Sequence, residues 1–370
     1  MKVFGKQVTA ISIIIAILVF GIIVLVHEWG HFIVARRVGV IVQEFAIGMG
    51  PKLIGHTSKK GTLYSLRLLP IGGYCKMLGE EEAVDEEGSY SSKSVPARMA
   101  IVAAGPLMNF VLAFVILLFF CGIYGYTTTY VNEVEADYPA AAAGLESGDR
   151  FLSINGHRVH LFNKISYLLS EYQEGDTVTA VVEKPDGTKK ELEFKPKYDE
   201  AQGRYRMGFS AKTSGGNLSD VLKSEGIGAL PSYLGGMISN SFWTLCFDVE
   251  LTVRGFVQLI TGQVGADAVA GPIGIVTIIG DSYEQGLAYG FTTALYNVFS
   301  MIVLLSVNLG ALNLFPIPAL DGSRLVFHAI EGIRRKPVNP KVENAIYMIG
   351  FVLLMILMVV IAFSDIRKLL

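Results

Sequence analysis

Charged residues are scarce in this chain of 370 residues, and positive charge is not in excess. Asp, Glu, Lys and Arg together make up 17% of the residues, against 51% for the hydrophobic types. That balance is too apolar for an ordinary soluble enzyme and predicts a polytopic membrane protein. The formal net charge of −2 leaves no strongly basic face to neutralise phosphates, so we expect no nucleic-acid partner.

Cysteine and histidine are scarce as well. The cysteines are odd in number and show no C-x-x-C spacing, which favours neither a disulfide framework nor a cysteine-based zinc site. They are Cys75, Cys121 and Cys246. Four of the six histidines have no partner four residues away, so we expect them to be surface or interfacial residues. They are His56, His157, His160 and His328.

The remaining two histidines belong to an HExxH motif in VLVHEWGHF, at the end of a long apolar run. On a helix, His27 and His31 project from one face, where two imidazoles can bind one Zn2+ ion. Glu28 has the position of the general base that takes a proton from the attacking water in metalloproteases. Ionisable groups are costly in hydrocarbon and functional there by default, which favours a catalytic site. The alternative is that the run ends at Val26 and that the motif is a polar interfacial flank.

Residues 8–26 carry no charge and as a helix would rise roughly 28 Å, close to the ~30 Å hydrocarbon core of a bilayer. A cleavable signal peptide is the alternative, because Lys2 and Lys6 precede the run, but no small-residue cleavage site follows it. Arg36 and Arg37, with further basic residues beyond, mark the next segment as cytoplasmic by the positive-inside rule. We therefore predict a spanning helix with its amino terminus outside.

A β-hairpin is predicted in this cytoplasmic segment, because residues 63–69 and 74–78 are typical of two short strands around a Gly-containing connection. The hairpin is either re-entrant, shielded from lipid at membrane depth, or a soluble surface element. An exposed edge could bind an extended substrate by strand addition, with Gly72 and Gly73 as contacts. The acidic segment 80–87 is expected to be a solvated loop.

A second spanning helix is predicted at residues 107–126, within a long uncharged stretch. Gly105 and Pro106 fit its start, since proline is tolerated in a first helical turn. Asn109, just inside, is expected to be a polar helix-packing contact.

Residues 131–214 then have the composition of a soluble domain. The stretch AGLESGDRFLSING predicts a turn, a strand at 151–154 and a second turn at Asn155-Gly156. It resembles a PDZ domain, which implies that peptides bind by strand addition. Three consecutive residues are the candidate groove: Met207, Gly208 and Phe209.

A catalytic zinc normally has three protein ligands and an open fourth position, so HExxH needs one more ligand at its own membrane depth. Asp321, in NLFPIPALDG, is the first charge after a long uncharged run, and Pro316 and Pro318 leave irregular backbone that can aim its carboxylate inward. The alternative is an interfacial aspartate that faces water. A shared metal requires four spans, with residues 220–262 along the outer surface as an amphipathic element.

The predicted fold is an α-helical polytopic membrane protein with four transmembrane helices, an inserted α+β PDZ domain and a membrane-associated β-hairpin. In chain order the segments are the first transmembrane helix with HExxH (1–37), a cytoplasmic loop with the re-entrant hairpin (38–98), the second transmembrane helix (99–127), an extracytoplasmic PDZ domain (128–215), amphipathic surface helices (216–285), the third transmembrane helix with the LDG motif (286–323), a basic cytoplasmic loop (324–343) and the fourth transmembrane helix (344–370).

HEWGH, PIGGY, AGPLMNF, the PDZ stretch and NLFPIPALDG follow one another along the chain, which thereby resembles the bacterial site-2 protease family of intramembrane zinc metalloproteases. The resemblance implies His27, His31 and Asp321 as Zn2+ ligands and Glu28 as the catalytic glutamate. It also implies that an NxxPxP element lies near bound substrate: Asn313, Pro316 and Pro318.

The resemblance further implies cleavage of single-span membrane proteins, such as anti-sigma factors or remnant signal peptides, within a bacterial cytoplasmic membrane. The PDZ domain is then expected outside and the active site toward the cytoplasm, with membrane lipid as the surroundings. Two other classes are a non-catalytic membrane PDZ scaffold, which would not need Glu28, and a metal transporter, which would need ionisable groups through both leaflets. The spans show such groups at one depth only.

Overall fold

The computed structural model describes residues 9–80, 84, 86–200, 203–265 and 270–369. The chain divides into two compact units, residues 1–113 with 248–370 and residues 114–247. The boundaries between the units fall within helix α2 (Val95–Tyr124) and helix α6 (Leu230–Ile260).

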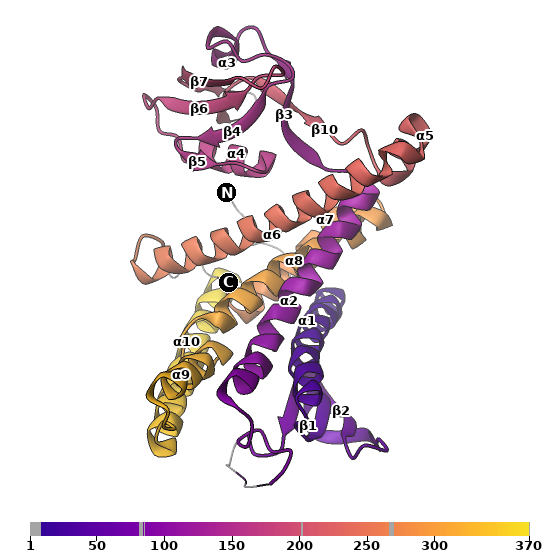
Figure 1. Cartoon of the computed structure of the whole chain (residues 1–370), viewed down its shortest axis with the longest axis vertical. Helices are drawn as coiled ribbons and strands as arrows, with labels where there is room; N and C mark the ends of the chain where they lie inside the picture. Colours follow the sequence, from indigo (N-terminus) through magenta and orange to yellow (C-terminus); the bar gives the residue numbers. More distant parts are fainter. Residues whose placement is uncertain (1–8, 81–83, 85, 201–202, 266–269, 370) are drawn as a thin grey trace. The chain divides into compact units, whose positions relative to one another are not determined.

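The first unit is mainly helical (Figure 1). Besides its parts of α2 and α6 it contains α1 (Ala10–Arg37), α7 (Pro272–Tyr289), α8 (Phe291–Leu314), α9 (Asp321–Arg334) and α10 (Pro340–Leu369). Within the described residues, four helices are long and apolar enough to cross a membrane. They are α1, α2, α8 and the Lys341–Arg367 part of α10. The chain therefore has the four apolar helices that its sequence predicts.

Helix α2 begins at Val95, twelve residues before the predicted start at residue 107, so the interpretation of Gly105 and Pro106 as a helix start is wrong. Both residues lie inside the helix, where proline forfeits one backbone hydrogen bond that neighbouring structure can make good. Small residues are found where α1 and α2 cross. A Cβ on Gly30 of α1 would lie 2.7 Å from the Cγ atom of Met108. Small residues here allow the two backbones to approach closely.

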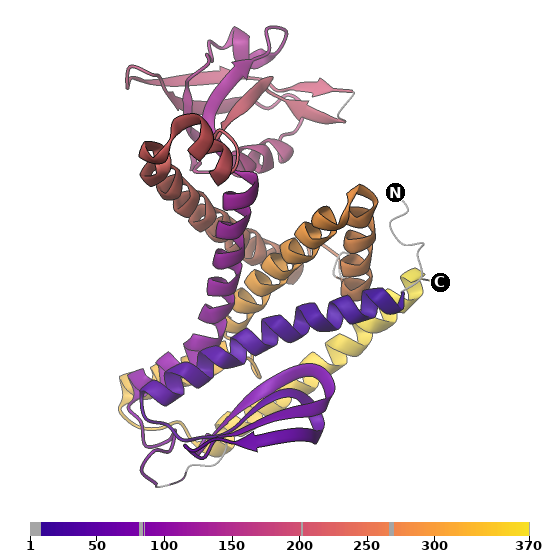
Figure 2. The ribbon, with the colours of Figure 1, turned by 90° about the vertical axis from the view of Figure 1, so that its right-hand side faces the viewer.

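The hairpin exists, but with other strands than predicted. β1 (Val42–Thr57) pairs antiparallel with β2 (Leu63–Met77), so both predicted strands belong to the single strand β2. The turn is at residues 58–62, and the Gly-Gly segment is an irregular part of β2 in which Gly72 has a φ of 79°. Glycine permits this conformation without strain, so it marks a bulge here and not a turn. Figure 2 shows the hairpin lying along α1.

Two segments predicted as loop or surface elements are helices with tertiary contacts. Residues 324–343 are not a basic loop, because α9 occupies most of them. His328, expected at a surface or interface, is buried in this helix. Helix α7 forms a pair with α8 (Figure 2) and packs against α1, where a Cβ on Gly280 would clash with Ser12. Residues 272–285 therefore form part of a helix whose small residues let it pack closely against its neighbours.

The third span is shorter than predicted. Helix α8 begins after Gly290 and ends at Leu314, where the Pro316 region stops it. The LDG motif lies at the start of α9 and not at the end of a spanning helix.

The second unit contains the PDZ domain. Its main sheet has the order β10-β3-β4-β6-β7, with β5 paired to β4, and β8 and β9 form a separate hairpin. The strands are β3 (Thr127–Val134), β4 (Arg150–Ile154), β5 (His157–Arg158), β6 (Val178–Glu183), β7 (Lys189–Phe194), β8 (Lys197–Asp199), β9 (Arg204–Arg206) and β10 (Phe209–Thr213). The helices are α3 (Pro139–Ala142), α4 (Phe162–Ser170), α5 (Leu218–Glu225) and the 3-10 turn η1 (Ile227–Ala229).

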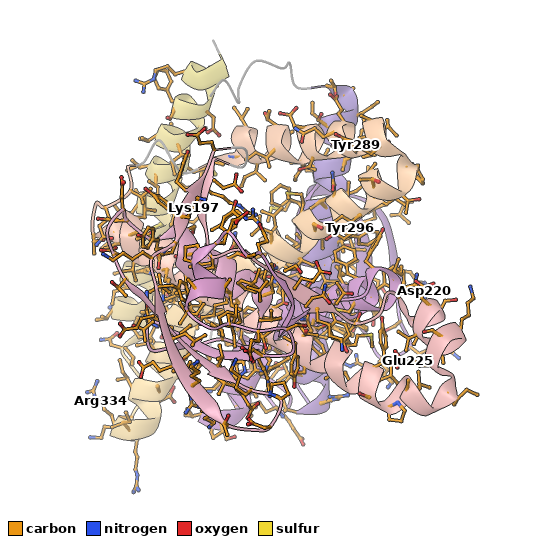
Figure 3. The ribbon with its side chains drawn as sticks, turned by 90° about the horizontal axis from the view of Figure 1, so that it is seen from above. Lys197, Asp220, Glu225, Tyr289, Tyr296 and Arg334 are labelled. Atoms are coloured by element: carbon orange, nitrogen blue, oxygen red, sulfur yellow. The ribbon has the colours of Figure 1, made fainter. Side chains whose placement is uncertain are left out.

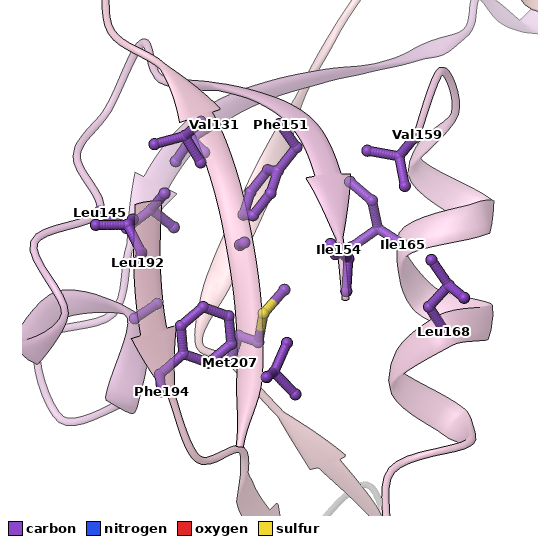
Figure 4. Packing of buried hydrophobic residues seen from close by; sticks show 14 residues of the cluster. Val131, Leu145, Phe151, Ile154, Val159, Ile165, Leu168, Leu192, Phe194 and Met207 are labelled. Carbon is purple, nitrogen blue, oxygen red and sulfur yellow. The ribbon is translucent and has the colours of Figure 1, made fainter. Parts of the chain in front are cut away.

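The PDZ core lies between this sheet and α4 (Figure 4). Phe151 and Ile154 from β4 are fully buried, and Ile165 and Leu168 of α4 pack against the same cluster. The predicted turn after β4 is confirmed, because Asn155 and Gly156 both have positive φ and link β4 to β5.

Candidate metal centre

Helix α1 brings the two histidines of HExxH onto one face. His27 and His31 are 7% and 8% exposed, and their Nε2 atoms lie 3.2 Å apart. Their ring centroids are 4.9 Å apart in an edge-to-face arrangement. This is the arrangement expected of two imidazoles that converge on one ion.

Asp321 joins them from the first turn of α9, 290 residues after His31. Its Oδ2 atom lies 3.1 Å from Nε2 of His27 and 3.5 Å from Nε2 of His31. The connection from α8 includes Ala319 with a φ of 74°, a left-handed conformation that is rare for alanine. Ligand atoms of all three side chains lie within 4.8 Å of one another. This unusual conformation lies two residues before Asp321, in the connection that positions its carboxylate.

The surroundings of the histidines fit a metal ion. The Nδ1 atom of His31 donates to the carbonyl oxygen of Ile101 at 2.8 Å, so its Nε2 carries the free lone pair. The amide of Asn109 lies 3.2 Å from Nδ1 of His27, and its Oδ1 atom is buried without a partner among the described residues. Turning this amide lets Oδ1 accept from Nδ1–H, which satisfies the oxygen and frees Nε2 of His27. Two imidazoles and a carboxylate are a donor set that Zn2+ prefers.

Glu28 is half-buried beside this cluster, on the turn of α1 between the two histidines. Gly73 of β2 lies next to it, since a Cβ on this glycine would be 3.7 Å from Cγ of Glu28. Strand β2 therefore runs directly past the predicted general base.

A cavity of about 1,260 Å³ opens at these residues. It is bounded by the histidines and Glu28 of α1, by β2 from Tyr74 to Met77, and by Asp321 and Arg324 of α9. Burial, with the Glu28 and Glu80 carboxylates nearby, raises the pKa of the Cys75 thiol well above its ordinary range, so this thiol stays protonated. The cavity has room for an extended peptide segment between β2 and the cluster.

The residues predicted to contact substrate fall into two groups. Gly72 and Gly73 lie on β2, and Gly73 adjoins Glu28. Asn313 is buried at the end of α8, and Pro318 packs against Gly350 of α10. Within the described part of the chain, the residues that line the cavity do not include Asn313, Pro316 or Pro318.

The predicted PDZ groove residues line a separate cavity of about 410 Å³ in the second unit. Met207, Gly208 and Phe209 form one side of it, and Phe162 and Ile165 of α4 form the other. A strand end opposite a helix is the geometry in which PDZ domains accept an extended peptide.

One residue of the centre was not found from the sequence. A Cβ on Gly105 of α2 would lie 2.6 Å from Cε1 of His31 and 2.8 Å from Nε2 of His27. A glycine is therefore required for α2 to pass the histidines. The sequence signal was Gly105-Pro106 within an uncharged helix, which is equally typical of a helix start.

The chain matches Peptidase family M50 over residues 15–357 and belongs to this family, the site-2 proteases. A putative zinc metalloprotease from Clostridium acetobutylicum is 34% identical over 355 residues, which are 96% of this chain and 97% of the relative. Zinc metalloprotease RasP from Shouchella clausii is 32% identical, over 95% of this chain and 98% of the relative. This chain is accordingly a zinc-dependent membrane metalloprotease of bacterial type.

Among solved structures, the chain is similar to the PDZ domain of an SdrC-like protein from Listeria monocytogenes. The similarity covers 26% of this chain and 93% of that domain, at 23% identity and a TM-score of 0.21.

Proposed function

We propose that the protein hydrolyses peptide bonds in or next to the transmembrane segment of single-span membrane proteins. The observation that carries this proposal is the convergence of His27, His31 and Asp321 beside Glu28, on and next to helices with the length and apolarity of membrane spans. Ionisable groups in such surroundings are costly and are retained for function.

The chemistry follows from the positions of these side chains. When bound by His27, His31 and Asp321, Zn2+ supplies Lewis-acid polarisation and makes water more acidic. Glu28 accepts a proton from the water that attacks the scissile carbonyl, and it can return that proton to the leaving amide nitrogen. The histidines and Asp321 orient one another, because their donor atoms already converge.

Substrate docking on β2 would solve the problem that a helical substrate hides its carbonyls in hydrogen bonds. An unwound segment next to Gly72 and Gly73 would find replacement backbone partners on this strand, directly beside Glu28. The family pattern assigns Asn313, Pro316 and Pro318 to substrate contact as well. Asn313 lies at the end of α8, and Pro316 and Pro318 lie in the connection that leads to Asp321. These positions support such a contact for a substrate that reaches the cavity.

We place the protein in the bacterial cytoplasmic membrane, with the metal cluster toward the cytoplasm and the PDZ domain outside. Basic residues after α1 and after α9 support this orientation by the positive-inside rule. Two variants test this orientation in intact cells: His157→Cys in the PDZ domain and Lys336→Cys after α9. An impermeant maleimide should label the first position only, and labelling of position 336 from outside contradicts the orientation.

The substrates that fit best are remnants left after a first cleavage outside, such as trimmed anti-sigma factors or signal peptides. The PDZ cavity at Met207, Gly208 and Phe209 is the candidate contact for their new outer ends.

The proposal is tested with the purified full-length protein in lipid vesicles. The substrate is a single-span protein, and the control is a soluble peptide with the same spanning sequence shortened to dissolve in water. Mass spectrometry of the products should place the cut within or next to the span of the vesicle-bound substrate. Cleavage confined to soluble peptides or to extramembrane loops would overturn the proposal.

A further inference from the structure

Helix α9 turns charged and polar side chains toward the protein and apolar side chains outward, which is the reverse of the usual arrangement. Its inward face carries Arg324, His328 and Glu331, whereas its outward face carries Val326, Ile330 and Ile333. A helix at the surface of a water-soluble domain buries its apolar stripe and exposes its charges. The reversal indicates that the outward face does not meet bulk water.

The inward side chains are held by three contacts to segments that precede and begin α2. Arg324 pairs with Glu80, and the Tyr90 hydroxyl donates to Nε2 of His328 at 2.7 Å. Arg98 of α2 pairs with Glu331 at 2.7 Å. Because these polar groups satisfy one another, the rotation of α9 about its axis is fixed. The outward stripe is therefore a defined feature of the fold.

The outward stripe is continuous and apolar. Val326, Ile330 and Ile333 follow at spacings of four and three residues, so they share one face of the helix. Their exposed fractions are 42%, 36% and 84%. An exposed aliphatic stripe of this kind is typical of a helix that lies in a membrane interface.

Cations follow the stripe at the end of the helix. Arg334, Arg335 and Lys336 are exposed, and in the described part of the chain none of them forms an ion pair. Arg334, the last residue of α9, is labelled in Figure 3. An apolar stripe that ends in cations without counter-ions complements a surface with acyl chains below and negative headgroups above.

The connections of α9 restrict where this surface can lie. Only residues 315–320 separate it from the spanning helix α8, and only residues 335–339 separate it from α10, which contains the fourth candidate span. A helix tied to two spans by connections this short stays at the membrane boundary. The positive-inside rule assigns this boundary to the cytoplasmic leaflet, where anionic lipids attract clustered Lys and Arg.

We propose that the outward face of α9, formed by Val326, Ile330, Ile333 and the cations Arg334, Arg335 and Lys336, binds anionic phospholipids of the membrane surface. The isoleucines enter the region of the upper acyl chains, and the three cations bind the phosphate headgroups. The proposal does not depend on the protein's being a protease, because lipid binding is measured without cleavage.

The test uses the full-length protein in phosphatidylcholine bilayers that contain a trace of spin-labelled phosphatidylglycerol or spin-labelled phosphatidylcholine. The motionally restricted fraction of each label gives the relative association of the two lipids with the protein. We expect phosphatidylglycerol to be preferred by the native chain. Since each basic residue contributes about a fivefold gain, the triple variant Arg334→Gln, Arg335→Gln, Lys336→Gln should lose at least fivefold of that preference.

A matched control removes three exposed cations from the PDZ domain, Lys189→Gln, Lys190→Gln and Lys195→Gln, and should keep the preference. The conservative variant Arg334→Lys, Arg335→Lys should keep it too. A second variant, Ile330→Asn with Ile333→Asn, should weaken the association of both lipids, because the stripe no longer enters the bilayer.

Three results would overturn the proposal. If the PDZ control lost as much preference for phosphatidylglycerol as the triple variant, the effect would be one of net charge in general. Full displacement of phosphatidylglycerol by inorganic phosphate would mean a site for free phosphate and not for lipid. Concentration-dependent self-association that the triple variant abolishes, with no lipid preference in the native chain, would mean that a second copy of the chain covers this face.

Discussion

The Nδ1 atom of His31 on α1 donates a hydrogen bond of 2.8 Å to the carbonyl oxygen of Ile101 on α2. This contact joins two apolar helices through a polar group of the candidate metal centre, and it leaves Nε2 of His31 directed at Asp321. A metal-binding histidine whose second nitrogen is fixed in this way has one tautomer and one ring orientation. The crossing of α1 and α2 therefore belongs to the proposed metal site and does more than pack the helices.

A methyl group at Gly105 should disrupt this crossing. In Gly105→Ala the added Cβ would lie 2.6 Å from Cε1 of His31, so the imidazoles must move apart. We expect zinc affinity to fall about tenfold or more, as for loss of an outer-shell partner. Gly21→Ala on α1 is the control, since no atom lies within 4 Å of its Cβ. Chelator competition measures the affinity, and equal affinities for the two variants would refute the close approach.

Asn109 should orient His27 by accepting a hydrogen bond from its Nδ1–H. Asn109→Leu keeps the approximate size but removes the acceptor, and we expect zinc affinity to fall by roughly 10- to 100-fold. Asn109→Asp keeps an acceptor oxygen at the same place and should retain most of the affinity. If Asn109→Asp and Asn109→Leu lowered the zinc affinity equally, the Asn109 side chain would act by packing alone.

The stability of α9 should depend on pH through His328. Burial, assisted by the Arg98 guanidinium and opposed by Glu331, lowers the pKa of His328 to about 4. In the unfolded chain a histidine titrates near ~6.5, so between these values only the unfolded state binds the proton. The free energy of unfolding therefore falls as pH is lowered from 7 to 5, by about 2 kcal/mol from this residue.

The variant His328→Gln isolates that contribution, because Gln stays neutral and can still accept from Tyr90. Thermal unfolding in detergent should show a smaller loss between pH 7 and pH 5 for this variant than for the native chain. His157→Gln, at an exposed position of the PDZ domain, should behave like the native chain. Identical pH dependence of His328→Gln and the native chain would contradict the burial of a neutral imidazole.

The hairpin should depend on Glu44 for its shape. This carboxylate accepts hydrogen bonds from Ser65, Arg67 and Tyr74 at 2.6 to 2.9 Å, and so ties β1 to both halves of β2. Glu44→Ala should loosen residues 63–77, which hydrogen exchange would detect as faster exchange there, and should reduce cleavage because Gly73 is no longer held at Glu28. Glu87→Ala, an exposed carboxylate, is the control. Unchanged exchange in Glu44→Ala would refute the role of this network.

Much of the site could be predicted because membrane depth restricts it. Two histidines near the end of one span need a ligand at the same depth, and Asp321 was the first charge after a long uncharged run. The structure brings these three side chains together. Gly105 could not be assigned in advance, because its role depends on which helix crosses α2 at that point. Sequence pattern reports the faces of a helix but not its partners.

The wrong predictions about the fold share one physical origin. In each case tertiary contacts override a local sequence signal. Gly72 and Gly73 are typical of a turn, yet β1 pairs along the whole of β2 and the glycines form a bulge. The basic segment after Asp321 is polar enough for a loop, yet two of its charged residues, Arg324 and Glu331, lie on the inner face of α9 and pair with Glu80 and Arg98. A polar residue is expected to face water until its partners are known.

We propose that Glu28 acts as the general base at a zinc site formed by His27, His31 and Asp321. The most direct test of this proposal compares the native chain with Glu28→Gln, measuring zinc content and cleavage of a single-span substrate in the same vesicle preparations. The variant should hold zinc at the native ratio and cleave at least about 100-fold more slowly, since general base catalysis contributes a factor of this order. Cleavage by Glu28→Gln at the native rate would contradict the assignment.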